Sequence, residues 1–149
     1  MKLLILSDLH LVFAKFTPDP AAVAAADAVV LAGDIGEGLR GTRWAAQAFP
    51  STKPVLYVAG NHEFYGNDWG LMRSHLRQDC AGTNLHFLDN DAVVIDGVRF
   101  LGASLWTDFT LLARTEGILM GKAQAMVAAR RGLNDFHLIQ NAGKRFTPG

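Results

Sequence analysis

The sequence predicts an α/β fold built on a parallel sheet, and three observations support that prediction. Residues 2–6, 28–32 and 54–59 form almost wholly apolar runs, as expected of strands that are covered on both faces. Each run ends in a polar cluster, and a segment compatible with a helix separates it from the next. Alternation of strand and helix implies parallel strands joined by right-handed crossovers.

The segments between the strands carry signals for where helices begin and end. Residues 21–26 follow an Asp-Pro pair at 19–20, which supplies an N-cap and a first-turn proline. Residues 39–49 stop before a proline, which cannot continue a helix. An Asn-Asp pair at 67–68 is expected to cap a third helix that runs to residue 78.

The second half of the chain shows a different pattern. Residues 85–88 predict a short strand. Asp96 and Gly97 separate two predicted strands, 92–95 and 98–101, and Asp-Gly suits the tight type I′ turn of a hairpin. Residues 114–131 are expected to be helical, although two glycines weaken that prediction. The last dozen residues show no periodicity.

Composition excludes several classes of protein. The 149 residues suit one domain, and an apolar content of 50% is globular rather than disordered. Fourteen basic residues balance fourteen acidic ones, so no net field attracts nucleic acid or an anionic membrane. No apolar run approaches the roughly 18 residues of a membrane span. The only cysteine, Cys80, cannot form an internal disulfide, so a cytoplasmic location is expected.

Polar residues follow the three apolar strands at the point where each strand ends. Asp8 and His10 follow the first, Asp34 the second, and Asn61 and His62 the third. The carboxyl ends of parallel strands meet at one edge of the sheet, so these side chains are expected to converge. On an extended segment Asp8 and His10 would point the same way and chelate one ion. This set of oxygen and nitrogen donors suits Mn²⁺, Fe or Zn²⁺.

Taken singly, each of these short motifs also has an ordinary structural explanation. Gly-Asp at 33–34 and Gly-Asn at 60–61 are typical of turns. Asp8 and His10 could simply end a strand. Their shared position after buried strands favours a metal site, and Glu63 is interpreted as a supporting or structural residue.

The same motifs resemble those of the calcineurin-like metallophosphoesterase superfamily. That family's pattern is Asp-x-His, then Gly-Asp, then Gly-Asn-His-Asp/Glu. This sequence contains Asp-Leu-His at 8–10, Gly-Asp at 33–34 and Gly-Asn-His-Glu at 60–63, in the same order. The resemblance implies a sandwich of αββα layers and a phosphoester hydrolase that acts on a small phosphoester through two divalent metal ions (Mn, Fe or Zn).

The resemblance also implies a role for each residue. Asp8, His10 and Asp34 would hold the first metal, while Asp34 would bridge to a second metal that Asn61 also binds. His62 would be the catalytic residue that faces the phosphate. A metal-activated water would attack phosphorus directly, with no covalent enzyme intermediate.

The family pattern continues with a further metal-binding histidine and a later Gly-His-x-His, which this sequence lacks. The remaining histidines, His75, His86 and His137, fit neither motif. We therefore expect residues 1–149 to be a single, truncated metallophosphoesterase domain in which much of the C-terminal sheet is missing. The first metal would keep three of four family ligands and the second two of four.

Two interpretations of function remain open at this point. One is the hydrolase described above, and the alternative is a catalytically impaired or inactive metal-binding or regulatory module that keeps half the site and retains one ion. Under either interpretation, a missing second sheet would leave an apolar face for a homo-oligomer or a partner.

Overall fold

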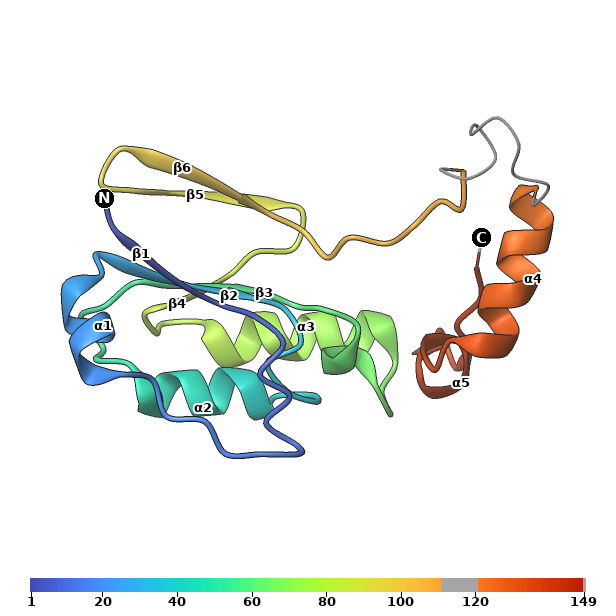
Figure 1. Ribbon diagram of the computed structural model, residues 1–149, viewed down its shortest axis with the longest axis horizontal. Helices are drawn as coiled ribbons and strands as arrows, with labels where there is room; N and C mark the ends of the chain where they lie inside the picture. The colour runs from blue at the N-terminus through green and yellow to red at the C-terminus, as the bar shows by residue number, and fades with distance from the viewer. Residues whose placement is uncertain (111–120, 149) are drawn as a thin grey trace.

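The computed structural model describes residues 1–110 and 121–148, and its centre is a four-stranded parallel sheet (Figure 1). In spatial order the strands are β1 (Leu3–Leu6), β2 (Ala28–Ala32), β3 (Val55–Val58) and β4 (Leu85–Phe87). All three neighbouring pairs are parallel, which confirms the predicted α/β sheet.

Three helices lie on one side of this sheet (Figure 1). They are α1 (Pro20–Ala25), α2 (Arg40–Ala48) and α3 (Trp69–Cys80). The predicted caps are confirmed, since the Asp19 carboxylate accepts from the Ala21 amide at 3.0 Å and Asp68 caps α3 in the same way. Within the described residues, no helix is long and apolar enough to cross a membrane.

A hairpin lies over the other face of the sheet (Figure 1). Its strands, β5 (Asp91–Ile95) and β6 (Val98–Gly102), are antiparallel and joined by the predicted Asp-Gly turn. The hairpin touches the sheet closely at Gly102, where a Cβ atom would collide with Leu88 and crowd Val58. It covers the face only in part, because Leu3 and Ile5 of β1 stay 40% and 62% exposed.

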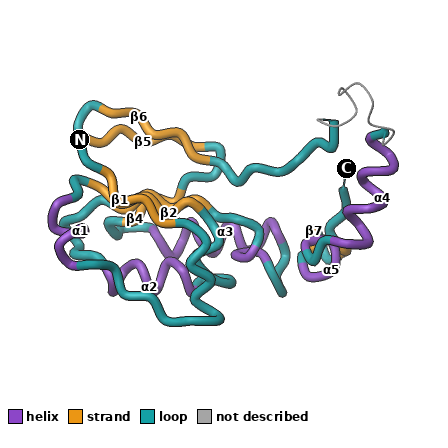
Figure 2. The backbone as a smooth tube through the Cα atoms, viewed as in Figure 1, coloured by secondary structure: helices purple, strands orange, loops and turns teal. Residues whose placement is uncertain are grey.

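The C-terminal segment contains one element that the sequence predicted and three that it did not. Helix α4 (Lys122–Gly132) confirms the described part of the helix expected over 114–131. The elements α5 (Asp135–Leu138), β7 (Gln140–Asn141) and β8 (Lys144–Arg145) were not predicted, and Figure 2 labels the first two of them. Part of the predicted helix over 114–131 lies outside the described residues. Packing rather than local propensity anchors α5, because Phe136 and Ile139 are buried and the Phe146 ring stacks on Trp69 at 5.6 Å.

Candidate metal centre

The loops that follow β1 and β2 stay hydrogen bonded to each other beyond the ends of the strands. The Asp8 amide donates to the Gly33 carbonyl at 3.1 Å, and the His10 amide donates to the Asp34 carbonyl at 3.0 Å. This pairing aligns the two loops along the carboxyl edge of the sheet. The edge is where ligands bind in open α/β folds.

Three of the predicted site residues have an unusual backbone conformation. Asp8, His10 and Asp34 have φ angles of 54°, 44° and 54°, in the left-handed region that residues other than glycine rarely adopt. The prediction that Asp8 and His10 lie on an extended segment is therefore wrong. Each such residue costs about 1–3 kcal/mol, and strain of this kind concentrates at functional sites.

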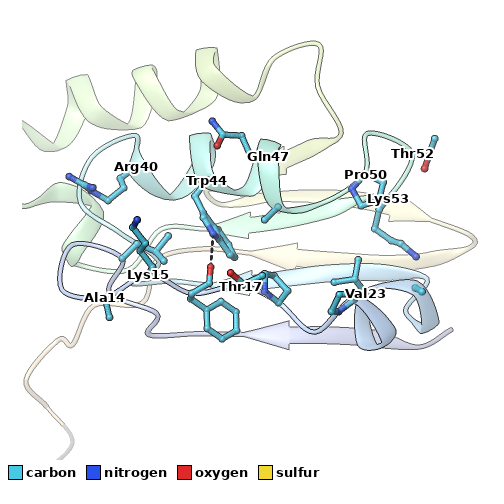
Figure 3. A pocket seen from close by; sticks show the side chains of 16 residues that line it. Ala14, Lys15, Thr17, Val23, Arg40, Trp44, Gln47, Pro50, Thr52 and Lys53 are labelled. Carbon is cyan, nitrogen blue, oxygen red and sulfur yellow. Dashed lines mark hydrogen bonds between the residues drawn. The ribbon is translucent and has the colours of Figure 1, made fainter.

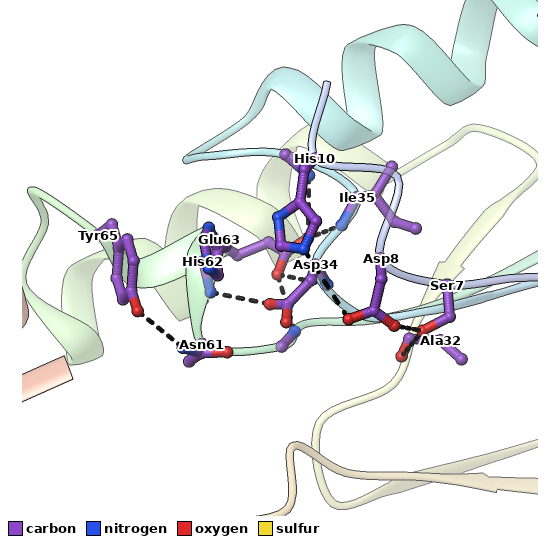
Figure 4. A network of polar contacts seen from close by, with 12 residues as sticks. Ser7, Asp8, His10, Ala32, Asp34, Ile35, Asn61, His62, Glu63 and Tyr65 are labelled. Carbon is purple, nitrogen blue, oxygen red and sulfur yellow. Dashed lines mark hydrogen bonds and ion pairs between the residues drawn. The ribbon is translucent and has the colours of Figure 1, made fainter. Parts of the chain in front are cut away.

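His10, Asp34 and His62 come together at this edge, one from the loop after each of the first three strands. Each offers a ligand atom, and the three atoms all lie within 4.8 Å of one another (Figure 4). The centroids of the two imidazole rings are 4.4 Å apart and the rings meet edge to face. The three residues are half-buried. We call this group the triad.

The other two predicted residues flank the triad. The Asp8 carboxylate accepts a hydrogen bond from the Ser7 hydroxyl. Its side chain is 66% exposed, and its Oδ1 lies 3.9 Å from His10 Nε2. Asn61 donates from Nδ2 to the Tyr65 hydroxyl at 2.9 Å, and its amide oxygen lies on the side that faces Asp34 (Figure 4). The structure thus places Asp8 at the exposed rim and Asn61 next to the triad.

Glu63 connects the loops that carry the triad. Its carboxylate is fully buried and accepts from the amides of Asp34, Ile35 and Gly60 at 3.1, 2.9 and 2.8 Å, and from the Tyr57 hydroxyl at 2.9 Å. Burial raises the pKa of the Glu63 carboxyl, and these hydrogen bonds oppose the rise. Burial, followed by the charge of Glu63, raises the pKa of Tyr57. The supporting role predicted for Glu63 agrees with these contacts.

Two glycines leave the space that Asp34 occupies. The His62 amide donates to Asp34 Oδ1 at 2.9 Å, which fixes one carboxylate oxygen. A Cβ atom on Gly60 would collide with Oδ1 and Cγ of Asp34, so no larger residue fits there. Gly33, with a φ of 93°, would bring a Cβ to within 3.0 Å of the Gly60 amide nitrogen. The position of Asp34 therefore depends on both glycines.

The chemistry of these side chains suits a divalent cation. Nδ1 of His10 and Nδ1 of His62 are buried and have no hydrogen-bond partner among the described residues. Buried nitrogens without a partner are costly, and a metal ion would satisfy a lone pair. In residues 1–110 and 121–148, neither Asp8 nor Asp34 forms an ion pair with lysine or arginine. Two imidazoles, carboxylates and an amide oxygen fit Mn, Fe or Zn.

The sequence interpretation missed two residues that contact Asn61. Tyr65 lies three residues after His62, at the end of the short 3₁₀ helix η1 (His62–Phe64), and Asp135 begins α5. Asn61 Nδ2 donates to Asp135 Oδ1 at 2.7 Å, and the Tyr65 hydroxyl donates to the same oxygen at 2.8 Å. Burial, and then Asp135, raises the pKa of Tyr65. No motif marks Asp135, which lies 74 positions from Asn61.

The three remaining histidines, which fit no family motif, are not members of the triad. His75 is exposed on α3, His86 is on the edge strand β4, and His137 is exposed on α5.

Two cavities border this part of the molecule. The first, of about 640 Å³, is lined by Asp34, Asn61 and Asp135 on one side and by apolar residues of β2, β3 and β6 on the other. The second is a groove of about 950 Å³ between the loop after β1 and helices α1 and α2 (Figure 3), and Trp44 and Arg40 line it. No triad residue lines the second groove. The first cavity, which Asp34 and Asn61 line, therefore borders the candidate site.

Comparisons with known proteins found a matching family model, a similar solved structure and a similar relative. The family model described as the calcineurin-like phosphoesterase superfamily domain matches residues 1–128. The crystal structure of phosphopantetheinyl hydrolase (PptH) from Mycobacterium tuberculosis matches with a TM-score of 0.57 and 20% identity, covering 93% of this chain and 55% of that one. An uncharacterised protein of Acanthamoeba polyphaga mimivirus is 23% identical over 122 residues, which are 75% of this chain and 39% of that protein.

Proposed function

This chain belongs to the calcineurin-like phosphoesterase superfamily, and from that premise we propose that it is a metal-dependent phosphoester hydrolase whose metal-activated water attacks phosphorus. The single observation that carries the proposal is the triad, whose ligand atoms lie within 4.8 Å of one another. We also propose that residues 1–149 belong to a single metallophosphoesterase domain.

The proposed metal ligands are those that the family resemblance implies, and the triad shares His10 and Asp34 with that set. Asp8, His10 and Asp34 would hold one ion, and Asp34 and Asn61 would hold a second. Divalent ions, when bound, lower the pKa of water to about 7 and neutralise charge that develops on the phosphoryl oxygens. Asp34 is suited to the bridging role, because the His62 amide and the Glu63 network fix its carboxylate and its backbone.

His62 is the proposed catalytic residue. Its imidazole lies between the rings of His10 and Tyr65, with centroid distances of 4.4 and 4.3 Å. These ring contacts fix the orientation of the imidazole, so in its protonated form it can donate to a phosphoryl oxygen or to the leaving oxygen. Tyr65 limits the rotation of His62 without taking its protons, because no hydrogen bond joins the two side chains in the described structure.

An aryl phosphodiester that releases nitrophenol tests the proposal with the Mn²⁺-loaded chain. We expect turnover above that of free Mn²⁺, and we expect Asp34→Asn to lose both metal binding and turnover. Substitution of a residue that only supports a metal ligand lowers metal affinity or activity about 10–100-fold. Substitution of the bridging ligand itself should therefore lower them more than about 100-fold. Asp96→Asn, in the exposed hairpin turn, is the matched control. Equal turnover by Asp34→Asn would overturn the bridging assignment.

The alternative, a metal-binding module with half a site, is favoured by one observation. The triad does not include Asp8, whose side chain is 66% exposed. Isothermal titration with Mn²⁺ distinguishes the two functions. Two bound ions per chain support the hydrolase, whereas one weakly bound ion without turnover supports the module.

We propose a small phosphoester as the substrate. No lysine or arginine is among the described residues that line the cavity beside the triad, so this cavity offers no cationic track for a nucleic-acid backbone. The bound metals would therefore be the main partners of a single phosphate group.

We further propose that a second copy of this chain or a partner covers the open face of the sheet, and that the protein is cytoplasmic. Leu3 and Ile5 of β1 are exposed on that face, and Leu101 of the hairpin strand β6 is exposed as well. The proposed location is supported by Cys80, which is a free, buried thiol. Exposed apolar patches favour association. Light scattering at tens of micromolar checks this, since a sharply monodisperse monomer would contradict self-association.

A further inference from the structure

Helix α5 brings a carboxylate to the residue proposed to bind the second metal. Asp135, the first residue of α5, accepts from Asn61 Nδ2 at 2.7 Å and from the Tyr65 hydroxyl at 2.8 Å, both at Oδ1. Asn61 Nδ2 also donates to the Tyr65 oxygen at 2.9 Å. The three side chains form a closed ring of hydrogen bonds beside the triad.

This ring determines which way the Asn61 amide points. An ionised carboxylate only accepts hydrogen bonds, so Asp135 requires the NH₂ group of Asn61 on its side. A flipped amide would place two oxygens 2.7 Å apart and lose both donations from Nδ2. The amide oxygen is thereby left on the side of Asp34 (Figure 4), which is where a metal ligand must be.

The position of Asp135 is itself anchored to the segment that carries Asn61. The Gly66 amide donates to the Leu138 carbonyl at 2.9 Å, and the Gln140 amide donates to the Asn67 carbonyl at 3.0 Å. Phe136 is buried and stacks on Phe146, which in turn stacks on Trp69. These contacts of the residues that follow Asp135 hold it against the segment from 61 to 69.

Asp135 fits a positioning role better than the role of a metal ligand. The group of side chains whose ligand atoms converge within 4.8 Å contains His10, Asp34 and His62 and does not include Asp135. In metal sites, a carboxylate that accepts a hydrogen bond from a metal-binding side chain commonly fixes the orientation of that side chain. Asp135 acts through Asn61 in the same way.

We propose that Asp135 is a positioning residue of the second metal position, where it orients the Asn61 amide so that its oxygen faces Asp34. The inference rests on the metal-dependent function proposed above. It predicts that Mn²⁺ affinity depends on Asp135 only while residue 61 is an amide that must be oriented. An aspartate at position 61 has two equivalent oxygens and needs no such orientation.

A double-mutant cycle measured by isothermal titration with Mn²⁺ tests this prediction. The variants are Asp135→Asn, Asn61→Asp and the double variant, with Asp96→Asn as the control for the loss of one carboxylate. We expect Asp135→Asn to weaken binding of the second ion about 10–100-fold in the parent chain. In the Asn61→Asp background we expect no loss, or a gain, because the substitution relieves repulsion between two carboxylates.

The outcomes separate a positioning role from a structural one. If Asp135→Asn weakened binding equally in both backgrounds, the effect would come from undocking of α5 and the inference would be overturned. Unchanged affinity in Asp135→Asn would overturn the inference while leaving the hydrolase proposal intact. If the parent chain bound no Mn²⁺, both the positioning role of Asp135 and the hydrolase proposal would be overturned. Thermal unfolding of each variant, monitored by circular dichroism, checks that the fold is retained.

Discussion

The two faces of the central sheet are covered very differently. On the face covered by helices, Leu31, Val55 and Tyr57 are fully buried. On the face covered by the hairpin, Leu3 and Ile5 are 40% and 62% exposed. Burial of an apolar side chain stabilises by roughly 1.5–3 kcal/mol, so the helix-covered face contributes most of the apolar stabilisation of the sheet.

The difference matters for the site because a side chain of the helix-covered face is hydrogen bonded to the network that holds it. The buried Tyr57 hydroxyl donates to the Glu63 carboxylate, which also accepts from the amides of Asp34 and Gly60. The hairpin borders the site across a cavity to which Leu101 contributes, and the Ser104 hydroxyl, just after β6, donates to the Ala59 carbonyl. The helix-covered core therefore preorganises the candidate metal centre, and the hairpin borders it.

The largest expected effect compares one leucine from each region. Leu31→Ala removes a fully buried side chain and should lower the free energy of unfolding by about 2–5 kcal/mol. Leu101→Ala, at a side chain that is 79% exposed, should change it by less than about 0.5 kcal/mol. Urea denaturation monitored by circular dichroism measures both. Similar losses in the two variants would show that the hairpin layer is as important to stability as the helix layer.

A smaller effect is expected where the helix-covered core meets the site. Glu63→Gln replaces one carboxylate oxygen by an NH₂ group, so either Ile35 or the pair Asp34 and Gly60 loses its acceptor. An unsatisfied buried donor costs about 1–3 kcal/mol. We expect a loss of about 2 kcal/mol in urea denaturation, together with weaker Mn²⁺ binding in titration calorimetry. Glu37→Gln, at an exposed position, is the matched control, and equal stability of the two variants would contradict the supporting role.

The part of the molecule that could be predicted from sequence is the part where local signals and burial agree. The strands over 28–32 and 85–88 and the helix cap at Asp68 were predictable, because apolar runs and capping residues act over a few positions. The convergence of His10 and Asp34 was predictable from the parallel sheet alone. For these residues, topology determines which side chains lie close together.

What could not be predicted depends on contacts between distant segments. Asp135 contacts Asn61 because Phe136 and Ile139 are buried next to it, and no sequence motif marks that packing. The left-handed φ angle of Asp8 was also not predicted, because aspartate, although enriched among residues with such angles, adopts them in only a minority of cases. Local patterns carry no information about such tertiary contacts.

The smallest expected effect concerns Cys80, whose thiol lies in the helix-covered core. Burial, with a further contribution from Asp79, raises the pKa of the Cys80 thiol from 9.0 to about 12. Between pH 9 and 12 the native chain keeps the thiol proton while the unfolded chain loses it. The contribution of the thiol to the free energy of unfolding is therefore fully present below pH 9 and is lost between pH 9 and 12. Between pH 7 and 10 the free energy of unfolding of the parent chain should fall by about 1 kcal/mol more than that of Cys80→Ala, as measured by urea denaturation. Identical pH profiles would show that the thiol is hydrated in the folded chain and that the helix-covered face is less tightly closed than its burial indicates.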